Sequence, residues 1–251
     1  MSEPIKTPVS VVVIVKNGAE FIVDMLETLK EFDEVLVYDN GSTDGTQAKL
    51  SAFNNVRLIE GEFLGFGPTK HKAVTLAKND WVLSLDVDER VSENLTTSIK
   101  EVDFSQPCAF AVLRENHFMG KKVRFSGWGN DWLIRFFHRS VANFNDSMVH
   151  ENVVLTQAVR TSKLKGTIKH LAVNDLSEFL IKVNRYSSIR AEASRKSLPV
   201  TLIVLKSLFA FFRTYFLRLG FLDGWRGLVI SFSNANGVFW KNMKSYVKFI
   251  K

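Results

Sequence analysis

Three short polar segments in this sequence contain side chains that can bind a charged ligand. They are Lys16-Asn17-Gly18, Asp39-Asn40-Gly41-Ser42-Thr43-Asp44 and Asp86-Val87-Asp88-Glu89. The third is the most informative, because two carboxylates one residue apart can hold Mg²⁺ or Mn²⁺ while a diphosphate supplies further oxygens. A metal in that position stabilises negative charge on a departing phosphate, which is Lewis-acid catalysis.

Each polar segment follows a run that predicts a buried strand. The β-branched residues at 9–15 are typical of a strand buried on both faces. Further strands are expected at 34–38, 55–60 and 81–85, and helices at 19–30, 43–53, 69–78 and 92–102. This alternation predicts a parallel α/β sheet, in which ligands bind outside the carboxyl ends of the strands. We therefore expect the three segments to meet at one edge of the sheet.

The pattern changes in the second half of the chain. Short strand-like pieces occur at 109–114, 132–138 and 153–159, and the residues from 175 onward have helical character. We predict a catalytic domain at residues 1–174, divided into halves at about 8–103 and 104–174. A helical C-terminal region at 175–251 completes the predicted organisation.

Each polar segment alone has a simpler explanation. An acidic turn after a strand is usually solvated or caps the next helix, and Ser92 is a suitable N-cap for the helix at 92–102. The recurrence of such turns after three strands favours a binding site. A P-loop ATPase is disfavoured, because Gly65-Phe66-Gly67-Pro68 lacks the Walker Gly-Lys-Ser/Thr ending. A dehydrogenase is disfavoured, because no G-x-G-x-x-G follows the first strand.

Several motifs, taken in order, resemble those of a known family. They are residues 11–17, 37–44, 63–67 leading to Lys70, 80–89, Val149-His150-Glu151 and 220–227. On these segments, within a likeness that runs from about residue 8 to 246, the chain resembles family 2 glycosyltransferases of the GT-A fold. Within that family it is similar to bacterial lipopolysaccharide core β-1,4-glucosyltransferases.

The resemblance implies a fold and an activity. The fold is the Rossmann-like GT-A fold of nucleotide-diphospho-sugar transferases, with a mixed central sheet, a nucleotide-sugar half at 8–103 and an acceptor half at 104–174. The activity is Mg²⁺- or Mn²⁺-dependent, inverting transfer of a hexose to a lipid-linked or lipopolysaccharide-core acceptor. Glucose from UDP-glucose is the first donor to expect. A base removes the proton of the acceptor hydroxyl as that hydroxyl attacks the sugar.

The resemblance also assigns residues to the donor pocket. Asp39 recognises the nucleotide base, and Lys16 and Asn17 line the same pocket. Lys70 lies near the base or the diphosphate. Asp86 contacts the ribose and the metal shell.

Metal ligands and a catalytic base are implied in the same way. Asp88 is the direct metal ligand, and His170, from the later part of the chain, can complete the metal shell. Glu151 stands where such enzymes keep the base. Asp131 is the next candidate for that role, and Asp146 lies nearby but could simply cap a turn.

The composition bears on partners and compartment. The net charge is +7, which is compatible with nucleic acid, anionic lipid or phosphorylated ligands, and most of the excess follows residue 160. The single cysteine, Cys108, excludes an intrachain disulfide and a multi-thiolate zinc site and fits a reducing compartment. Residues 1–8 contain no apolar core of a signal peptide. We expect a cytoplasmic protein that does not bind nucleic acid.

An apolar stretch near the C-terminus predicts contact with a membrane. Lys206, Arg213 and Arg218 interrupt the apolar residues 198–222, and the first two lie seven residues apart on nearly the same helical face. This pattern suits a helix in the interface of an anionic membrane, which would place the protein on the inner face of the cytoplasmic membrane. Further basic contacts are expected from Lys241, Lys244, Lys248 and Lys251. The alternative is that the helix packs on the catalytic domain or in a dimer.

Other readings of the sequence remain open at this stage. The acceptor could be a polyprenyl phosphate, a capsule or a protein glycan. A basic membrane- or nucleic-acid-binding module on a vestigial nucleotide fold would have no transferase activity. The sequence leaves the donor sugar, the linkage and the oligomeric state undetermined.

Overall fold

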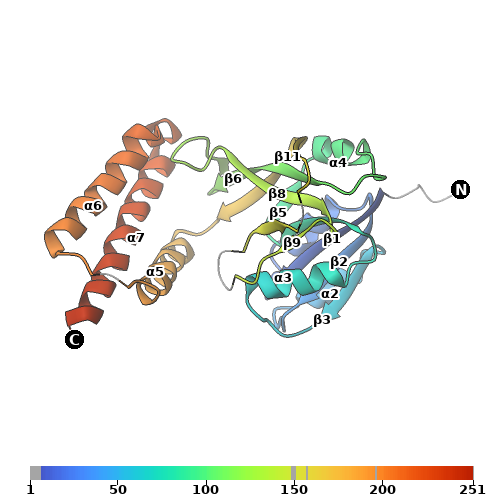
Figure 1. Cartoon of the computed structure of the whole chain (residues 1–251), viewed down its shortest axis with the longest axis horizontal. Coiled ribbons are helices and arrows are strands. Elements are labelled where there is room, and N and C mark those ends of the chain that lie inside the picture. The colour runs from blue at the N-terminus through green and yellow to red at the C-terminus, as the bar shows by residue number, and fades with distance from the viewer. Residues whose placement is uncertain (1–6, 148–150, 157, 196, 251) are drawn as a thin grey trace, which may run out of the picture. The chain divides into compact units, whose positions relative to one another are not determined.

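The chain divides into two compact units (Figure 1). The computed structural model describes residues 7–147, 151–156, 158–195 and 197–250. Unit 1 comprises Met1–Arg114 and Trp132–His170, and unit 2 comprises Glu115–Asp131 and Leu171–Lys251. Residues 115–131, which were expected in the acceptor half, therefore group with the C-terminal helices.

Four parallel strands form the first half of the sheet in unit 1. They are β1 (Thr7–Val15), β2 (Phe32–Asp39), β3 (Val56–Glu60) and β4 (Trp81–Asp86), in the order β3-β2-β1-β4. All four were predicted within a few residues; β1, β2 and β4 are mostly buried, as their apolar runs specify, whereas β3 at the edge of the sheet is partly exposed. Figure 1 labels β1, β2 and β3, which lie side by side.

The sheet continues with antiparallel pairing and is therefore mixed, as expected. Beyond β4 the order is β8-β6-β11-β5, with β7 paired to β6. β4 pairs with β8 and β11 pairs with β5 in antiparallel fashion. The bounds are β5 Glu89–Val91, β6 Ala109–Phe118, β7 Lys121–Lys122, β8 Asp131–His138 and β11 Thr161–Val173. The short strands β9 (Ala142–Phe144) and β10 (Val153–Leu155) form a separate pair.

Two apolar cores cover the faces of the parallel strands. On one face, Val11 and Val13 of β1 share a cluster with residues of α1 (Ile22–Glu27), α2 (Thr46–Leu50) and α4 (Glu93–Lys100). On the other face, Val12 joins a cluster with residues of α3 (Phe66–Thr75). Successive strand side chains point to opposite faces, so the uninterrupted apolar run of β1 serves both cores.

Unit 2 contains the C-terminal helices that the sequence predicts. They are α5 (Leu176–Glu192), α6 (Val200–Phe212), the π-helical turn η1 (Arg213–Leu217), the 3₁₀ turn η2 (Gly220–Asp223) and α7 (Trp225–Ile250). The Asp223 carboxylate accepts the backbone N–H groups of Arg124 and Phe125, each at 3.0 Å. Arg226 Nε donates to the carbonyl of Phe118 at 2.9 Å. These bonds explain why residues 115–131 belong to the helical unit.

One segment of unit 2 is long and apolar enough to cross a membrane. Among the described residues it is Val200–Leu217, judged by length and composition alone, and only 17% of it is buried. Core helices of soluble proteins can pass the same test, but they are mostly buried. The low burial of this segment sets it apart from such helices.

Candidate functional site

The register of the sheet brings the predicted polar segments to one edge. Val15 at the end of β1 pairs with Asp39 of β2, and its neighbour Ile14 pairs with Asp86 of β4. Parallel strands end on the same side, so the turns after β1, β2 and β4 share the carboxyl edge of the sheet. The predicted meeting of the three segments is therefore confirmed.

Hydrogen bonds join the turns after β1 and β2. Asn17 adopts a left-handed conformation with φ of 57°, and its Oδ1 accepts the N–H of Thr43 at 2.8 Å. The Asn17 N–H donates to Ser42 Oγ at 2.8 Å. Asp44 accepts the N–H of Ala19 at 2.8 Å, and this bond and one from Thr46 lower the pKa of Asp44 below its usual range, with the Thr46 side chain the larger cause. The loop is thus held in one shape.

Asp39 is buried within this loop, and Lys16 is exposed beside it. One Asp39 oxygen accepts the N–H and the hydroxyl of Ser42, at 2.9 and 2.7 Å. The other accepts Gln47 Nε2 at 2.7 Å. A carboxylate oxygen can accept two hydrogen bonds, so the second oxygen retains capacity for a ligand donor.

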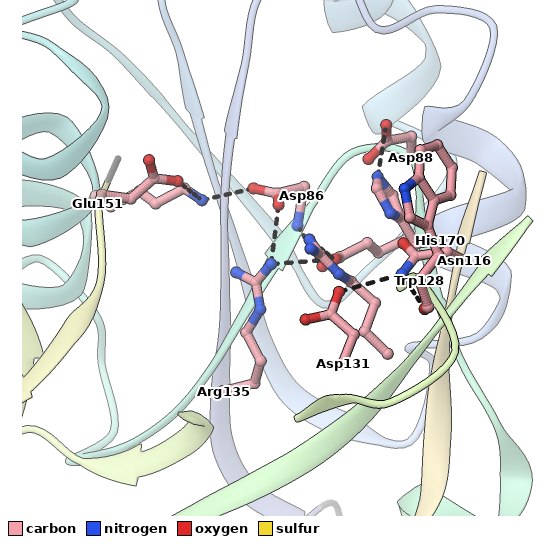
Figure 2. A network of polar contacts seen from close by, with 11 residues as sticks. Asp86, Asp88, Asn116, Trp128, Asp131, Arg135, Glu151 and His170 are labelled. Atoms are coloured by element: carbon pink, nitrogen blue, oxygen red, sulfur yellow. Dashed lines mark hydrogen bonds and ion pairs between the residues drawn. The ribbon is translucent and has the colours of Figure 1, made fainter. Parts of the chain in front are cut away.

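Asp86 lies at the centre of a charged cluster in unit 1 (Figure 2). Lys70 Nζ donates to Asp86 Oδ1 at 2.6 Å and to Glu151 Oε1 at 2.8 Å, and only 2% of the Lys70 side chain is exposed. Arg135 Nη2 donates to Asp86 Oδ2 at 3.0 Å and to Glu89 Oε1 at 3.1 Å. Lys70 therefore links the turn after β4 to the candidate base Glu151.

The two cations determine the charge state of Asp86. Burial alone would raise the pKa of Asp86, but the charges and hydrogen bonds of Lys70 and Arg135 hold it far below its usual range. Burial would lower the pKa of Arg135, and Glu89 and Asp86 outweigh that effect and raise it. Both groups are charged at neutral pH, and the carboxylate oxygens of Asp86 each face a cation.

Sequence reasoning missed Arg135, and it named Glu89 as part of an acidic segment without giving it a role. Glu89 is completely buried; its Oε2 accepts the N–H of Asp86 at 2.9 Å, and its Oε1 also lies 3.5 Å from Arg114. Arg135 interrupts the apolar strand β8, and such a position is a usable signal, because buried arginines are rare unless paired. Among the described residues, Arg135 Nε has no hydrogen-bond partner. An unpaired buried donor of this kind calls for an acceptor.

Asp88 and His170 form a second pair beside the cluster. Asp88 Oδ2 lies 3.5 Å from His170 Nε2, and both side chains are partly exposed. β11 brings His170 there, because His170 pairs with Glu89 in the β11–β5 ladder. A carboxylate and an imidazole are suitable ligands for a divalent cation.

The three predicted metal ligands do not gather as one group. No cluster of three or more acidic, histidine or cysteine ligands occurs within the described part of the chain. Asp86 is instead paired with Lys70 and Arg135. The remaining pair still fits a Mg²⁺ or Mn²⁺ ion, which commonly takes one or two protein ligands and completes its shell with water and substrate phosphates.

The second candidate base, Asp131, belongs to unit 2. Its Oδ2 accepts Asn116 Nδ2 at 3.1 Å, and the same amide donates to the carbonyl of Trp128 at 3.0 Å. Val149 and His150, which precede Glu151 in the predicted motif, lie outside the described residues.

Several known proteins are similar to this chain in sequence or in structure. The family model described as "Glycosyl transferase family 2" matches residues 10–163, which is more than half of the chain. An uncharacterized glycosyltransferase of Rickettsia bellii is 27% identical, over 92% of this chain and 83% of that protein. The lipopolysaccharide core biosynthesis glycosyltransferase LpsC of Rhizobium meliloti is 25% identical, over 88% and 84%. The crystal structure of S. aureus TarS 1–349 in complex with UDP is 17% identical, with a TM-score of 0.49 over 98% and 92%.

Proposed function

The chain belongs to glycosyl transferase family 2 and has the GT-A fold. We propose that it transfers a hexose from a UDP-linked donor to a lipopolysaccharide-core or other lipid-linked acceptor. The observation that carries the proposal is the Lys70 bridge between Asp86 and Glu151. It joins the turn where nucleotide sugars bind in this fold to a carboxylate able to act as a base. The name of LpsC supports the acceptor class, and glucose is the first donor sugar to test.

The donor nucleotide would lie along the carboxyl edge of the sheet. The ordered loop of Asn17 and Asp39, with Lys16 exposed beside it, offers donors and acceptors for a base and ribose. Lys70, which is paired with Asp86 and Glu151, would lie near the base or the diphosphate. Arg135 Nε, which has no hydrogen-bond partner among the residues that the structure describes, supports an anionic ligand near Asp86.

Asp88 and His170 would hold Mg²⁺ or Mn²⁺, with the donor diphosphate and water as further ligands. When bound, such an ion supplies Lewis-acid stabilisation of the departing nucleotide diphosphate. Asp86 would contribute to this region as a fixed negative charge between Lys70 and Arg135.

Glu151 would act as the general base. Its carboxylate accepts the acceptor hydroxyl proton while the hydroxyl oxygen attacks the anomeric carbon and the nucleotide diphosphate leaves. Attack from the side opposite the leaving group inverts the anomeric centre. Lys70 orients Glu151 through the 2.8 Å bond and balances its charge before the proton moves. Asp131 remains the second candidate for this role.

The same chemistry could serve a polyprenyl phosphate, a capsule or a protein glycan, so the acceptor must be tested. Family membership makes the chain a glycosyltransferase, and the alternative of a binding module without activity is not retained. A lipid-linked acceptor is consistent with our proposal that the protein works at the inner face of the cytoplasmic membrane.

A donor panel tests the proposal. We expect release of UDP and transfer of sugar onto extracted core lipid from one UDP-sugar, only with Mg²⁺ or Mn²⁺ present. Glu151→Gln should lower kcat by about 10²-fold or more, in line with the loss of a general base, and Asp131→Asn should have a small effect. Equal activity of Glu151→Gln and wild type would reject the base assignment. Transfer only to a polyprenyl phosphate would reject the acceptor.

A further inference from the structure

The outward side of α6 and η1 is covered by large apolar side chains. Five of them form one face and are between 47% and 63% exposed: Leu205, Leu208, Phe209, Phe212 and Phe216. At about 100° per residue they occupy a single sector of the helix. A contiguous apolar face of this kind marks a contact with a protein, a ligand or a membrane.

The opposite side of the same segment packs on α7 through a mixture of apolar, small and polar residues. Ile203, Ala210 and Thr214 are buried there. Ser207 Oγ donates to the carbonyl of Ala235 at 2.8 Å, and Asn234 Nδ2 donates to Thr214 Oγ1 at 3.3 Å. Polar groups turned toward the partner helix and apolar groups turned outward are the reverse of a water-exposed helix pair. This is the packing of helices in contact with lipid.

Two cations lie along one flank of the apolar face. Lys206 and Arg213 are exposed and about 20° apart around the helix, between the apolar face and the α7 contact. The sequence contains no Asp or Glu from residue 197 to 222. In the part of the chain that the structure describes, neither cation forms an ion pair. The flank thus presents uncompensated positive charge.

We propose that α6 and η1 lie in the interface of an anionic bilayer. The five apolar side chains enter the acyl region, and Lys206 and Arg213 contact phospholipid phosphates. A second copy of the chain is a less suitable partner for the apolar face. The cationic flanks of the two copies would meet with no acidic side chain between them. A spanning orientation fits less well too, because both cations fall inside the 18-residue apolar window.

The lysines of α7 contribute less to this surface than the sequence suggested. Lys244 Nζ donates to Asn184 Oδ1 at 2.7 Å and to Ser187 and Ser188 at 2.8 Å, all on α5. Lys248 Nζ donates to the carbonyl of Glu192 at 3.2 Å. These two lysines join α5 to α7, and Lys251 lies outside the described residues. The cationic contact is therefore assigned to Lys206 and Arg213.

Vesicle sedimentation tests the inference on the full chain. We expect wild type to sediment with vesicles of phosphatidylcholine and phosphatidylglycerol, and at least about tenfold more weakly with phosphatidylcholine alone. F209D/F212D should lose affinity for both vesicle types. K206E/R213E should lose at least about tenfold for anionic vesicles only. Leu76→Asp, at an exposed apolar position of unit 1, is the matched control and should sediment like wild type.

The membrane contact takes its biological meaning from the proposed transferase activity, but different measurements test the two. Thermal unfolding of each variant reports whether it is folded. Failure of wild type to bind anionic vesicles, or wild-type binding by folded F209D/F212D, overturns the membrane contact. A dimer that F209D/F212D dissociates, without vesicle binding by wild type, overturns it in favour of a second copy. Nucleotide-dependent stabilisation of wild type, measured without vesicles, tests the transferase whatever the vesicle result.

Discussion

Glu89 shows how one buried carboxylate can organise a charged site. It is completely buried and accepts both the backbone N–H of Asp86 and a guanidinium N–H of Arg135. It therefore fixes the main chain of the acidic turn and holds the cation that faces the Asp86 side chain. A buried charge is tolerated only when paired and hydrogen-bonded, so Glu89 and Arg135 depend on each other.

Removing Arg135 should therefore destabilise the fold. We expect Arg135→Met to lower the free energy of unfolding by about 3 kcal/mol. Among the described residues, Glu89 would then have the more distant Arg114 as its ion-pair partner, and Asp86 would have Lys70. Urea denaturation at pH 7 measures the change. Lys100→Met is the matched control: its ion pair with Glu31 is solvent-exposed and should contribute less than about 1 kcal/mol. Equal losses for the two variants would contradict the pairing argument.

The sequence predicted part of this site and missed part of it. Asp39, Asp86 and Asp88 were identifiable because each follows a strand at the edge where ligands bind. Arg135 was missed because its partners lie 46 and 49 residues away in the chain. Such pairing becomes visible only when β8 is placed beside β4.

At the scale of elements, α4 is held against β11 by two close contacts. Ser92, the predicted N-cap, accepts the N–H of Leu95 at 3.3 Å and that of Thr167 at 2.9 Å. Gly166 of β11 has φ of +90° and lies against the backbone of Leu95, where an added Cβ would come within 2.2 Å of the nitrogen. The helix start and the strand thus touch through main-chain atoms, which requires glycine.

A side chain at position 166 should separate these elements. We expect Gly166→Ala to lower the free energy of unfolding by about 3 kcal/mol or more, because it adds a backbone clash to the left-handed strain. Gly120→Ala controls for strain alone: Gly120 has φ of +74° with nothing near the added Cβ, and about 1 kcal/mol is expected. Thermal or urea unfolding distinguishes the two. A Gly166→Ala cost no larger than that of Gly120→Ala would mean that α4 and β11 can move apart freely.

Elements defined by local sequence patterns were predicted well, and elements defined by contacts between distant residues were not. The parallel strands β1, β2 and β4 were predicted closely, since an apolar run is a local signal. The short strand β5 was missed, because three residues are too few to show the apolar–polar alternation of a strand. Its pairing with β11 also joins residues far apart in the chain. The helix expected at 19–30 is only Ile22–Glu27, since residues 18–21 form a turn with the Phe21 N–H bonded to the Gly18 carbonyl.

At the scale of the whole molecule, a ligand that binds only the folded chain stabilises it by mass action. The proposed site joins groups from β4, α3, β8 and β11. These elements come together only in the folded chain, so the unfolded chain cannot bind the donor in the same way. Saturation at about 100 times Kd contributes about 2.7 kcal/mol.

Thermal unfolding with UDP and Mn²⁺ therefore tests the metal assignment. For a chain of this size the stabilisation corresponds to a rise in Tm of about 5–10 °C. Neither UDP alone nor Mn²⁺ alone should produce the full shift, because the ion and the diphosphate complete each other's coordination. Asp88→Asn and His170→Gln should each remove most of it. Asp80→Asn, an exposed carboxylate outside the site, should keep the wild-type response. A full shift in Asp88→Asn would show that the nucleotide binds without an ion at Asp88, and the metal would have to be assigned to other residues.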